Sequence, residues 1–126
     1  MKPEAGNPLE DEGVLNPAAV RGLDRELYLF PRLVAKGNYS RIGIARVVFD
    51  AAGDPIGVER LGIALEPEAD YELSAKGGGC EDPRITFVEP LRHYVMTYTA
   101  LSRHGHALRS PFRQNVRRQP GLAEMP

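Results

Sequence analysis

Short runs of β-branched, aromatic and aliphatic residues recur along this chain at intervals of about ten residues, and glycine, proline or acidic residues bound each run. The clearest run is Asn38–Asp50, which alternates between apolar and polar positions with one break in register near Ala45–Arg46. Its core-facing candidates are Ile42, Ile44, Val47 and Phe49. Helical periodicity is nearly absent before residue 104. The spacing predicts an all-β protein of the sandwich, barrel or propeller type.

The other expected strands differ in where proline falls. Val14–Arg21 contains Asn-Pro and is expected to be a short edge or turn-bearing segment, because proline cannot donate to the ladder of a central strand. Glu26–Val34 is expected to be a strand interrupted by Pro31. After a turn at Ala51–Pro55, the remaining predictions are a strand at Gly57–Leu65 and an antiparallel hairpin of Arg84–Val88 and His93–Leu101.

The segment Lys76–Pro83 carries the residues with the clearest potential for chemistry. Its three consecutive glycines predict irregular structure, because glycine loses the most backbone entropy when it is ordered. Glu81 and Asp82 form a carboxylate pair, and Asp82 is expected to be held extended because the following proline disfavours the α region. A carboxylate fixed in this way can act as a general acid, with Arg84 orienting it or binding an anion. The alternative is that Asp82 and Arg84 only stiffen a surface turn.

Composition separates the two ends of the chain from its middle. Residues 1–13 hold prolines, glycines and acids without periodicity and are expected to form a lead-in arm. The last 24 residues carry five arginines and one glutamate, and residues 105–126 are expected to be an irregular tail. Without a fold or interleaved aromatic residues, those arginines do not predict a nucleic-acid partner.

The remaining composition fits a soluble protein. The formal net charge is −1, and no apolar stretch approaches the roughly 20 residues of a membrane-spanning helix. The N-terminus lacks the apolar run of a signal peptide, so we expect a cytoplasmic protein without a membrane partner. The one cysteine, Cys80, excludes an internal disulfide and cannot by itself form a structural zinc site. We expect no metal and no cofactor.

Five segments in chain order carry a resemblance to a known family. They are Asn16–Ala18, Tyr28–Arg32, Ser40–Ala45, Cys80–Thr86 and Tyr94–Ala100. Together they resemble glycoside hydrolase family 130, the family of β-mannoside phosphorylases and β-mannosidases. The resemblance covers residues 14–104 and stops after Gly105, where His106–Pro111 departs from the family pattern.

The resemblance implies a fold. Members of the family are five-bladed β-propellers, so residues 14–104 are expected to form a partial propeller, the first one or two blades. Tyr28, Phe30, Phe49, Phe87, Tyr94 and Tyr98 are expected in the blade core rather than as platforms for sugar. The abrupt change into residues 105–126 is what a frameshift would leave. We therefore expect an N-terminal fragment that is inactive alone, because an incomplete propeller leaves strand edges unpaired.

The resemblance also implies a function and a site. Asp82 takes the place of the family's catalytic acid, and Asn16 resembles a position that contacts sugar. Arg32 and Arg41 match arginines that line the funnel and bind substrate or phosphate, and Arg84 fits the same motif as Asp82. The implied reaction is inverting phosphorolysis of a β-mannoside, with inorganic phosphate as the co-substrate and a β-mannoside oligosaccharide as the partner. The full-length parent is expected to form a homo-oligomer.

Three alternatives stay open at the level of sequence. The family also contains inverting β-mannosidases, which use water instead of phosphate. The chain could instead be a gene product without activity, so whether it is an enzyme is undecided. The third alternative is a small all-β binding module that shares only the strand motifs.

Overall fold

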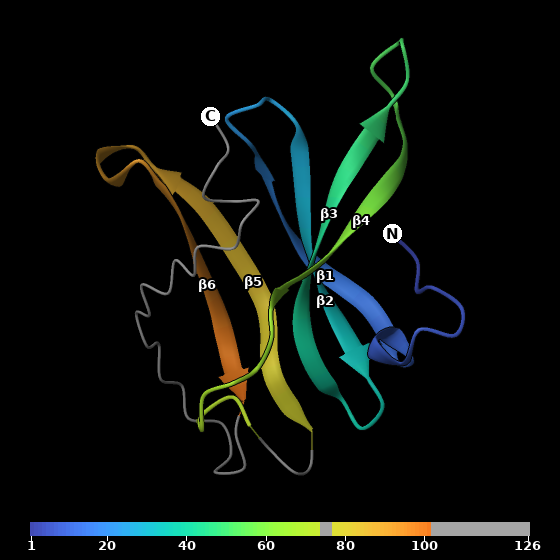
Figure 1. The fold of residues 1–126 in the computed structure, drawn as a ribbon, viewed down its shortest axis with the longest axis vertical. Coiled ribbons are helices and arrows are strands. Elements are labelled where there is room, and N and C mark those ends of the chain that lie inside the picture. Colours follow the sequence, from blue (N-terminus) through green and yellow to red (C-terminus); the bar gives the residue numbers. More distant parts are fainter. Residues whose placement is uncertain (74–76, 102–126) are drawn as a thin grey trace.

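The computed structural model describes residues 1–73 and 77–101, and strands make up most of this part (Figure 1). Two 3-10 helices, η1 (Pro8–Glu10) and η2 (Glu89–Leu91), are the helical segments described. The strands are β1 (Gly13–Arg21), β2 (Leu27–Ala35), β3 (Tyr39–Phe49), β4 (Pro55–Leu65), β5 (Gly78–Val88) and β6 (His93–Leu101). The all-β prediction is confirmed. The tail expected at residues 105–126 lies outside the described residues, as do residues 102–104 of the expected domain. No helix in the described ranges has the length and hydropathy to span a membrane.

The six strands form a meander and a hairpin. In the meander, β1 pairs antiparallel with β2, β2 with β3, and β3 with β4. In the hairpin, β5 and β6 pair antiparallel on either side of η2, as the sequence predicted. Two parallel residue pairs, Tyr39 with Gly78 and Ser40 with Gly79, join the hairpin to β3. Figure 1 shows the hairpin beside the meander, with β5 next to it and β6 outside.

Gly78 and Gly79 belong to β5. The expectation of irregular structure across Lys76–Pro83 was therefore wrong from Gly78 onward. A Cβ on Gly79 would lie 2.1 Å from the Ser40 carbonyl oxygen, and one on Gly77 would lie 2.6 Å from the Gly37 carbonyl oxygen. Only glycine therefore lets β5 approach the backbone of β3 so closely. Tertiary contact outweighs the entropy that glycine loses in the strand.

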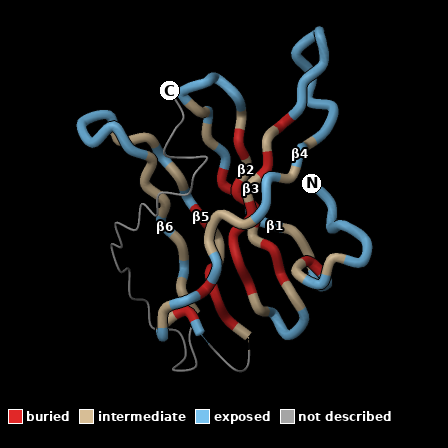
Figure 2. The backbone as a smooth tube through the Cα atoms, in the orientation of Figure 1, coloured by how far each residue is buried: buried red, intermediate tan, exposed pale blue. Residues whose placement is uncertain are grey.

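The core lies between the meander and the hairpin. Phe30, Ile42 and Cys80 are fully buried there, and Ala18 and Tyr28 complete the cluster. Figure 2 shows the buried residues concentrated in the middle of the strands.

The prediction for the third strand is confirmed in most of its parts. Ile42 and Val47 are buried, and Ile44 packs against the core. The pairing of β3 with β4 shifts register between Ile44 and Ala45, close to the expected break. Phe49 is 37% exposed, so its prediction was wrong. It stands at the end of β3, where the β3–β4 hairpin extends away from the core (Figure 2).

Proline does not interrupt β2. Pro31 is buried in a continuous strand, contrary to the expectation of a break. On the β1 side, the register shifts between Leu15 and Ala18, so Asn16 and Pro17 face Pro31 without direct partners in the ladder. A proline without an N–H group is tolerated there because this bulge interrupts the ladder. Of the two expectations for Val14–Arg21, the edge position is confirmed, and the segment holds a bulge in a continuous strand rather than a turn.

The first twelve residues pack against the meander. Glu10 in η1 is buried and forms an ion pair with Arg60 on β4. The Glu12 carboxylate accepts hydrogen bonds from the backbone N–H groups of Gly37 and Asn38, at 2.7 and 2.9 Å. These contacts connect the start of the chain to β4 and to the β2–β3 turn.

Candidate active site

Two β-bulges supply the central residues of the candidate site. The β1–β2 ladder shifts register between Leu15 and Ala18, and the β5–β6 ladder shifts between Glu81 and Arg84. Asn16 and Asp82 occupy these bulges with φ of 44° and 48°. Asp82 is therefore in the left-handed region, and the expectation that it is extended was wrong. A bulge often places one residue at positive φ, and Asn and Asp tolerate that conformation better than most residues.

The two bulges meet across the structure. The Asn16 side-chain amide donates a hydrogen bond from Nδ2 to Asp82 Oδ1 at 2.9 Å. Each of the two residues is followed by proline, which fixes the direction in which the strand continues. The candidate acid and the candidate sugar contact are thus held together by strands from the meander and the hairpin.

Arg32 on β2 connects this pair to its surroundings. Its guanidinium donates to Asp82 Oδ1 at 3.3 Å and to Glu81 Oε1 at 2.7 Å. It also donates from Nε to Ser40 Oγ at 2.9 Å and from Nη2 to Asn38 Oδ1 at 3.0 Å. The Arg32 side chain is only 11% exposed. With four partners around one planar group, the guanidinium has little freedom to move.

An open cleft of about 390 Å³ lies beside the two bulges. Its lining residues are Asn16, Pro17, Ala18, Ala19, Arg84 and Ile85. Arg84 is exposed, and its guanidinium donates to the carbonyl oxygen of Pro83 at 2.8 Å. The Asp82 side chain is 39% exposed. Small-molecule sites have volumes of roughly 300–1,000 Å³, so this cleft is large enough for part of a sugar chain.

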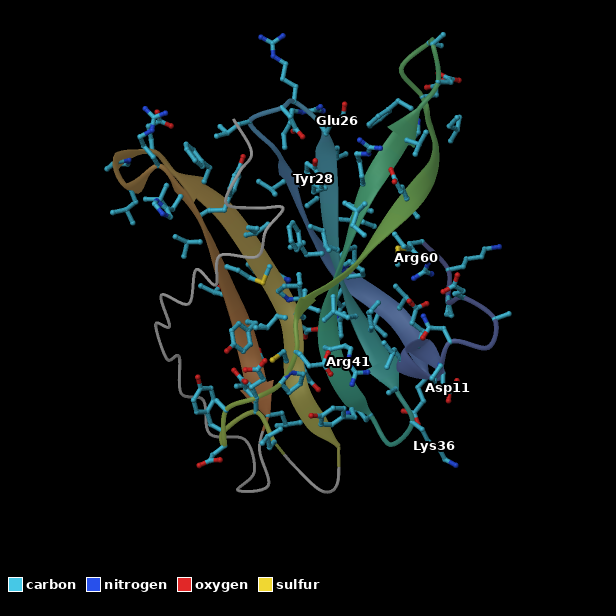
Figure 3. The ribbon with its side chains drawn as sticks, in the orientation of Figure 1. Asp11, Glu26, Tyr28, Lys36, Arg41 and Arg60 are labelled. Atoms are coloured by element: carbon cyan, nitrogen blue, oxygen red, sulfur yellow. The ribbon has the colours of Figure 1, made fainter. Side chains whose placement is uncertain are left out.

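Arg41 lies elsewhere, although the sequence grouped it with Arg32. In the β2–β3 ladder, Arg32 pairs with Ile42 and Leu33 pairs with Arg41. Because side chains alternate along a strand, Arg32 and Arg41 point to opposite faces of the meander. Arg41, which is labelled in Figure 3, forms an ion pair with Glu66 at 2.9 Å. Its guanidinium carbon lies 5.5 Å from the centre of the Tyr39 ring. The structure therefore brings together Asn16, Arg32, Asp82 and Arg84 but not Arg41.

Sequence reasoning missed three residues of this network. Glu81 was seen as half of a carboxylate pair, but nothing assigned it to Arg32. Ser40 and Asn38 were ordinary polar residues near a turn, and no spacing marks them as partners of an arginine on the preceding strand. Strand register is the signal that could have found them, since Ser40 lies on the same face as Arg32 once Arg32 pairs with Ile42.

Cys80 precedes the carboxylate pair but takes no part in the site. Its side chain is fully buried, and burial raises the pKa of the thiol well above its ordinary value. The thiol therefore stays neutral, and a neutral thiol is a poor nucleophile. In the part of the chain that the structure describes, no group of three or more His, Cys, Asp or Glu side chains could hold a metal ion.

Comparison with known proteins gives one result that bears on this site. A family model described as beta-1,4-mannooligosaccharide phosphorylase matches residues 4–117, a span that contains all six strands and every residue of the candidate site. Neither the curated proteins nor the solved structures gave a match. Since the family match covers most of the sequence, this chain belongs to glycoside hydrolase family 130, a family of mannoside phosphorylases and glycosidases.

Proposed function

We propose that this chain carries the proton-donating side of an inverting phosphorylase that acts on β-mannosides with inorganic phosphate. The observation that carries the proposal is the restraint on Asp82. Asn16 and Arg32 hold one of its carboxylate oxygens, while its side chain stays 39% exposed next to a cleft. A general acid needs both a fixed geometry and access to the substrate. The family match supports the choice of a mannoside as substrate.

The proposed reaction begins with proton transfer from Asp82 to the glycosidic oxygen, relayed through a hydroxyl group of the mannosyl ring. Phosphate attacks the anomeric carbon from the opposite face while the bond to the leaving sugar breaks. The leaving sugar keeps the proton, and the other product is α-mannose 1-phosphate. Solvent then returns a proton to Asp82. Acid and nucleophile act on opposite faces of the sugar, so the configuration inverts.

The neighbours of Asp82 take binding roles in this proposal. Asn16 commits its amide nitrogen to Asp82, so its carbonyl oxygen Oδ1 is the atom assigned to a sugar hydroxyl. Arg84 lines the cleft and is assigned to a sugar or phosphate oxygen. Arg41 is left out of the proposed site because it points to the opposite face of the meander and is paired with Glu66.

The fold proposal is that the meander is one blade of a five-bladed β-propeller and that the β5–β6 hairpin begins the next blade. A four-stranded antiparallel meander is the repeating unit of a propeller, which supports this assignment. Asn16 and Asp82 would then lie on the first strands of neighbouring blades. The groups that bind phosphate would come from further blades. The purified chain is therefore expected to bind mannoside without turning it over.

Binding and turnover test the proposal separately. Addition of β-1,4-mannobiose to the labelled chain is expected to shift the NMR signals of the Asn16 side-chain amide and of Arg84. Cellobiose, which differs from mannobiose only in the configuration of the 2-hydroxyl groups, is the matched control ligand. It should shift the same NMR signals less. The same preparations are assayed for α-mannose 1-phosphate, with and without phosphate. Glu89→Gln, in the exposed turn of the hairpin, serves as the control variant.

The outcomes separate the proposed function from its alternatives. Mannobiose that leaves every signal of the cleft unchanged would contradict the proposal. Turnover that requires phosphate and disappears in Asp82→Asn would establish the reaction and contradict the expected inactivity. Sugar release that proceeds without phosphate would instead identify a β-mannosidase.

A further inference from the structure

We propose that Glu81 is a positioning residue that controls, through Arg32, how Asp82 holds its proton; this inference rests on the proposed role of Asp82 as the proton donor. Neither the family match nor the sequence motifs assign a task to Glu81. The contacts that Arg32 makes with the two neighbouring carboxylates carry the argument.

Arg32 lies closer to the carboxylate of Glu81 than to that of Asp82. Its contact with Glu81 is 2.7 Å long, and the Glu81 side chain is 12% exposed. Its contact with Asp82 is 3.3 Å long, and the Asp82 side chain is 39% exposed. A shorter and more deeply buried ion pair is stronger, because water screens it less. The positive charge of Arg32 is therefore balanced mainly by Glu81.

This balance matters for a proton donor. A lone guanidinium next to Asp82 would stabilise the carboxylate form. It would therefore hinder uptake of the proton that Asp82 donates to the glycosidic oxygen in the proposed reaction. With Glu81 in place, Arg32 still holds Asp82 in position, but its net field at that carboxylate is weaker. Glu81 thus lets one arginine orient the Asp82 carboxyl group while most of the arginine's charge is balanced elsewhere.

The contacts also select the oxygen that carries the proton. Asp82 Oδ1 accepts hydrogen bonds from both Asn16 and Arg32. In a neutral carboxyl group the carbonyl oxygen is the better acceptor, so Oδ1 takes that role and the proton resides on Oδ2. Oδ2 accepts no hydrogen bond from any residue that the structure describes. That oxygen is therefore the one assigned to the substrate.

Within residues 1–73 and 77–101, few other charges face Asp82. Arg32 comes from β2, and Glu81 and Arg84 come from β5. β1 contributes the neutral amide of Asn16. On β6, the register partners of Glu81 and Arg84 are Thr99 and Thr97, which carry no charge. A change in how Asp82 titrates can therefore be traced to a small set of groups.

The test follows the side-chain carboxyl carbon of Asp82 by NMR while the purified, isotope-labelled chain is titrated through the acidic range. Glu81→Gln keeps the shape of the side chain but removes its charge. It is expected to lower the midpoint of the Asp82 titration by about 0.5–1 pH unit, because Arg32 then acts on Asp82 without compensation. Arg32→Gln is expected to raise the midpoint. Glu66→Gln, which breaks the Arg41–Glu66 pair on the opposite face, should leave it unchanged.

The variants distinguish positioning from a purely structural role. If Glu81 had a purely structural role, Glu81→Gln would lower the stability of the chain without moving the midpoint of the Asp82 titration. A folded Glu81→Gln variant with an unchanged or raised midpoint would therefore overturn the proposal. If that variant does not fold, Glu81→Gln is compared with the wild-type side chain in the Arg32→Gln background, where no buried arginine is left unpaired. Without Arg32, Glu81 has no arginine to act through, so the midpoint is expected to stay unchanged there. A midpoint lowered by about 0.5–1 pH unit in this background would show that Glu81 acts on Asp82 directly and would overturn the proposal equally. The titration needs no turnover, so its outcome is independent of the Asp82→Asn assay.

Discussion

Asn16 and Asp82 lie 66 positions apart in the sequence, yet a 2.9 Å hydrogen bond joins them between two backbone bulges of the same kind. Both residues have positive φ and both precede a proline. Backbone in this region is strained for residues other than glycine, and it persists only where the surrounding structure enforces it. Such strain is common at functional sites, which agrees with the position of this pair beside the cleft.

The conformation of Asn16 can be tested apart from its hydrogen bond. Asn16→Gly and Asn16→Ala both remove the amide that contacts Asp82. Glycine accepts positive φ freely, whereas alanine does not, so the alanine variant should be less stable by about 1 kcal/mol. Chemical denaturation of the two variants measures this difference. Equal stabilities would mean that the bulge relaxes when the side chain is lost.

The junction between β3 and β5 should not tolerate a methyl group at Gly79. Gly79→Ala places a Cβ 2.1 Å from the Ser40 carbonyl oxygen, so the two strands must separate. We expect a loss of stability of about 3 kcal/mol or more. Gly53→Ala is the matched control, because Gly53 also has positive φ but a Cβ there meets nothing within 4 Å. A similar loss in both variants would show that φ, not the close approach, limits the choice of residue.

Alkaline pH should destabilise the chain through Tyr28. Burial, followed by the hydrogen bond to Asp24, raises the pKa of Tyr28 from 10.0 to about 12. The unfolded chain therefore releases this proton at lower pH than the folded chain, and stability falls between pH 10 and about 12. Tyr28→Phe should lose less stability than the wild type over this range, as measured by urea denaturation at several pH values. Parallel pH profiles for the two proteins would contradict the expectation.

Cys80 should be protected from thiol reagents in the folded chain. It is the single cysteine in the sequence and is fully buried, and burial also raises the pKa of its thiol. At mildly alkaline pH we expect labelling at least about 100-fold slower than in denaturant. Because Cys80 follows the junction glycines, the rate reports how often the hairpin opens from the meander. Labelling as fast as in the denatured chain would contradict the described burial.

The ion pair between Glu10 and Arg60 should stabilise the chain more than an exposed pair does. Glu10 has a side chain only 1% exposed, so Glu10→Gln leaves Arg60 without its buried counter-charge. The expected loss is about 1–3 kcal/mol in chemical denaturation. Glu59→Gln breaks the pair with Arg46, in which both side chains are more than 40% exposed, and should have little effect. Losses of equal size would mean that burial does not strengthen the first pair.

The sequence predicted the parts of the fold that depend on local patterns. The alternation around Ile42 and the turn before Pro55 follow from residue type alone, and both are present in the structure. The strand at Gly78–Gly79 could not be predicted in the same way, because its reason is the carbonyl oxygen of Ser40, nearly forty positions away along the chain. A rule based on local sequence includes the entropy that glycine loses, but it does not include the distant carbonyl oxygen that makes glycine necessary at this position.

The site was predictable in its membership more than in its geometry. The family resemblance selected Asn16, Arg32, Asp82 and Arg84, which the structure gathers around one cleft and its adjoining network. Arg41 points away from Arg32 because a shift of one position along a strand reverses the face to which a side chain points. The backbone of Asp82 was mispredicted because the preference imposed by proline was applied without knowledge of the bulge.

The carboxylate of Glu12 has an effect well beyond the turn that it contacts. It fixes the backbone of Asn38, and the Asn38 side chain in turn accepts a hydrogen bond from Arg32. An affinity tag or deletion that displaces the first dozen residues would therefore disturb Arg32 and its partner Asp82 from a distance, without altering any residue around them. The residues before β1 therefore help to set the position of a side chain that lies at the opposite end of a chain of three hydrogen-bonded contacts.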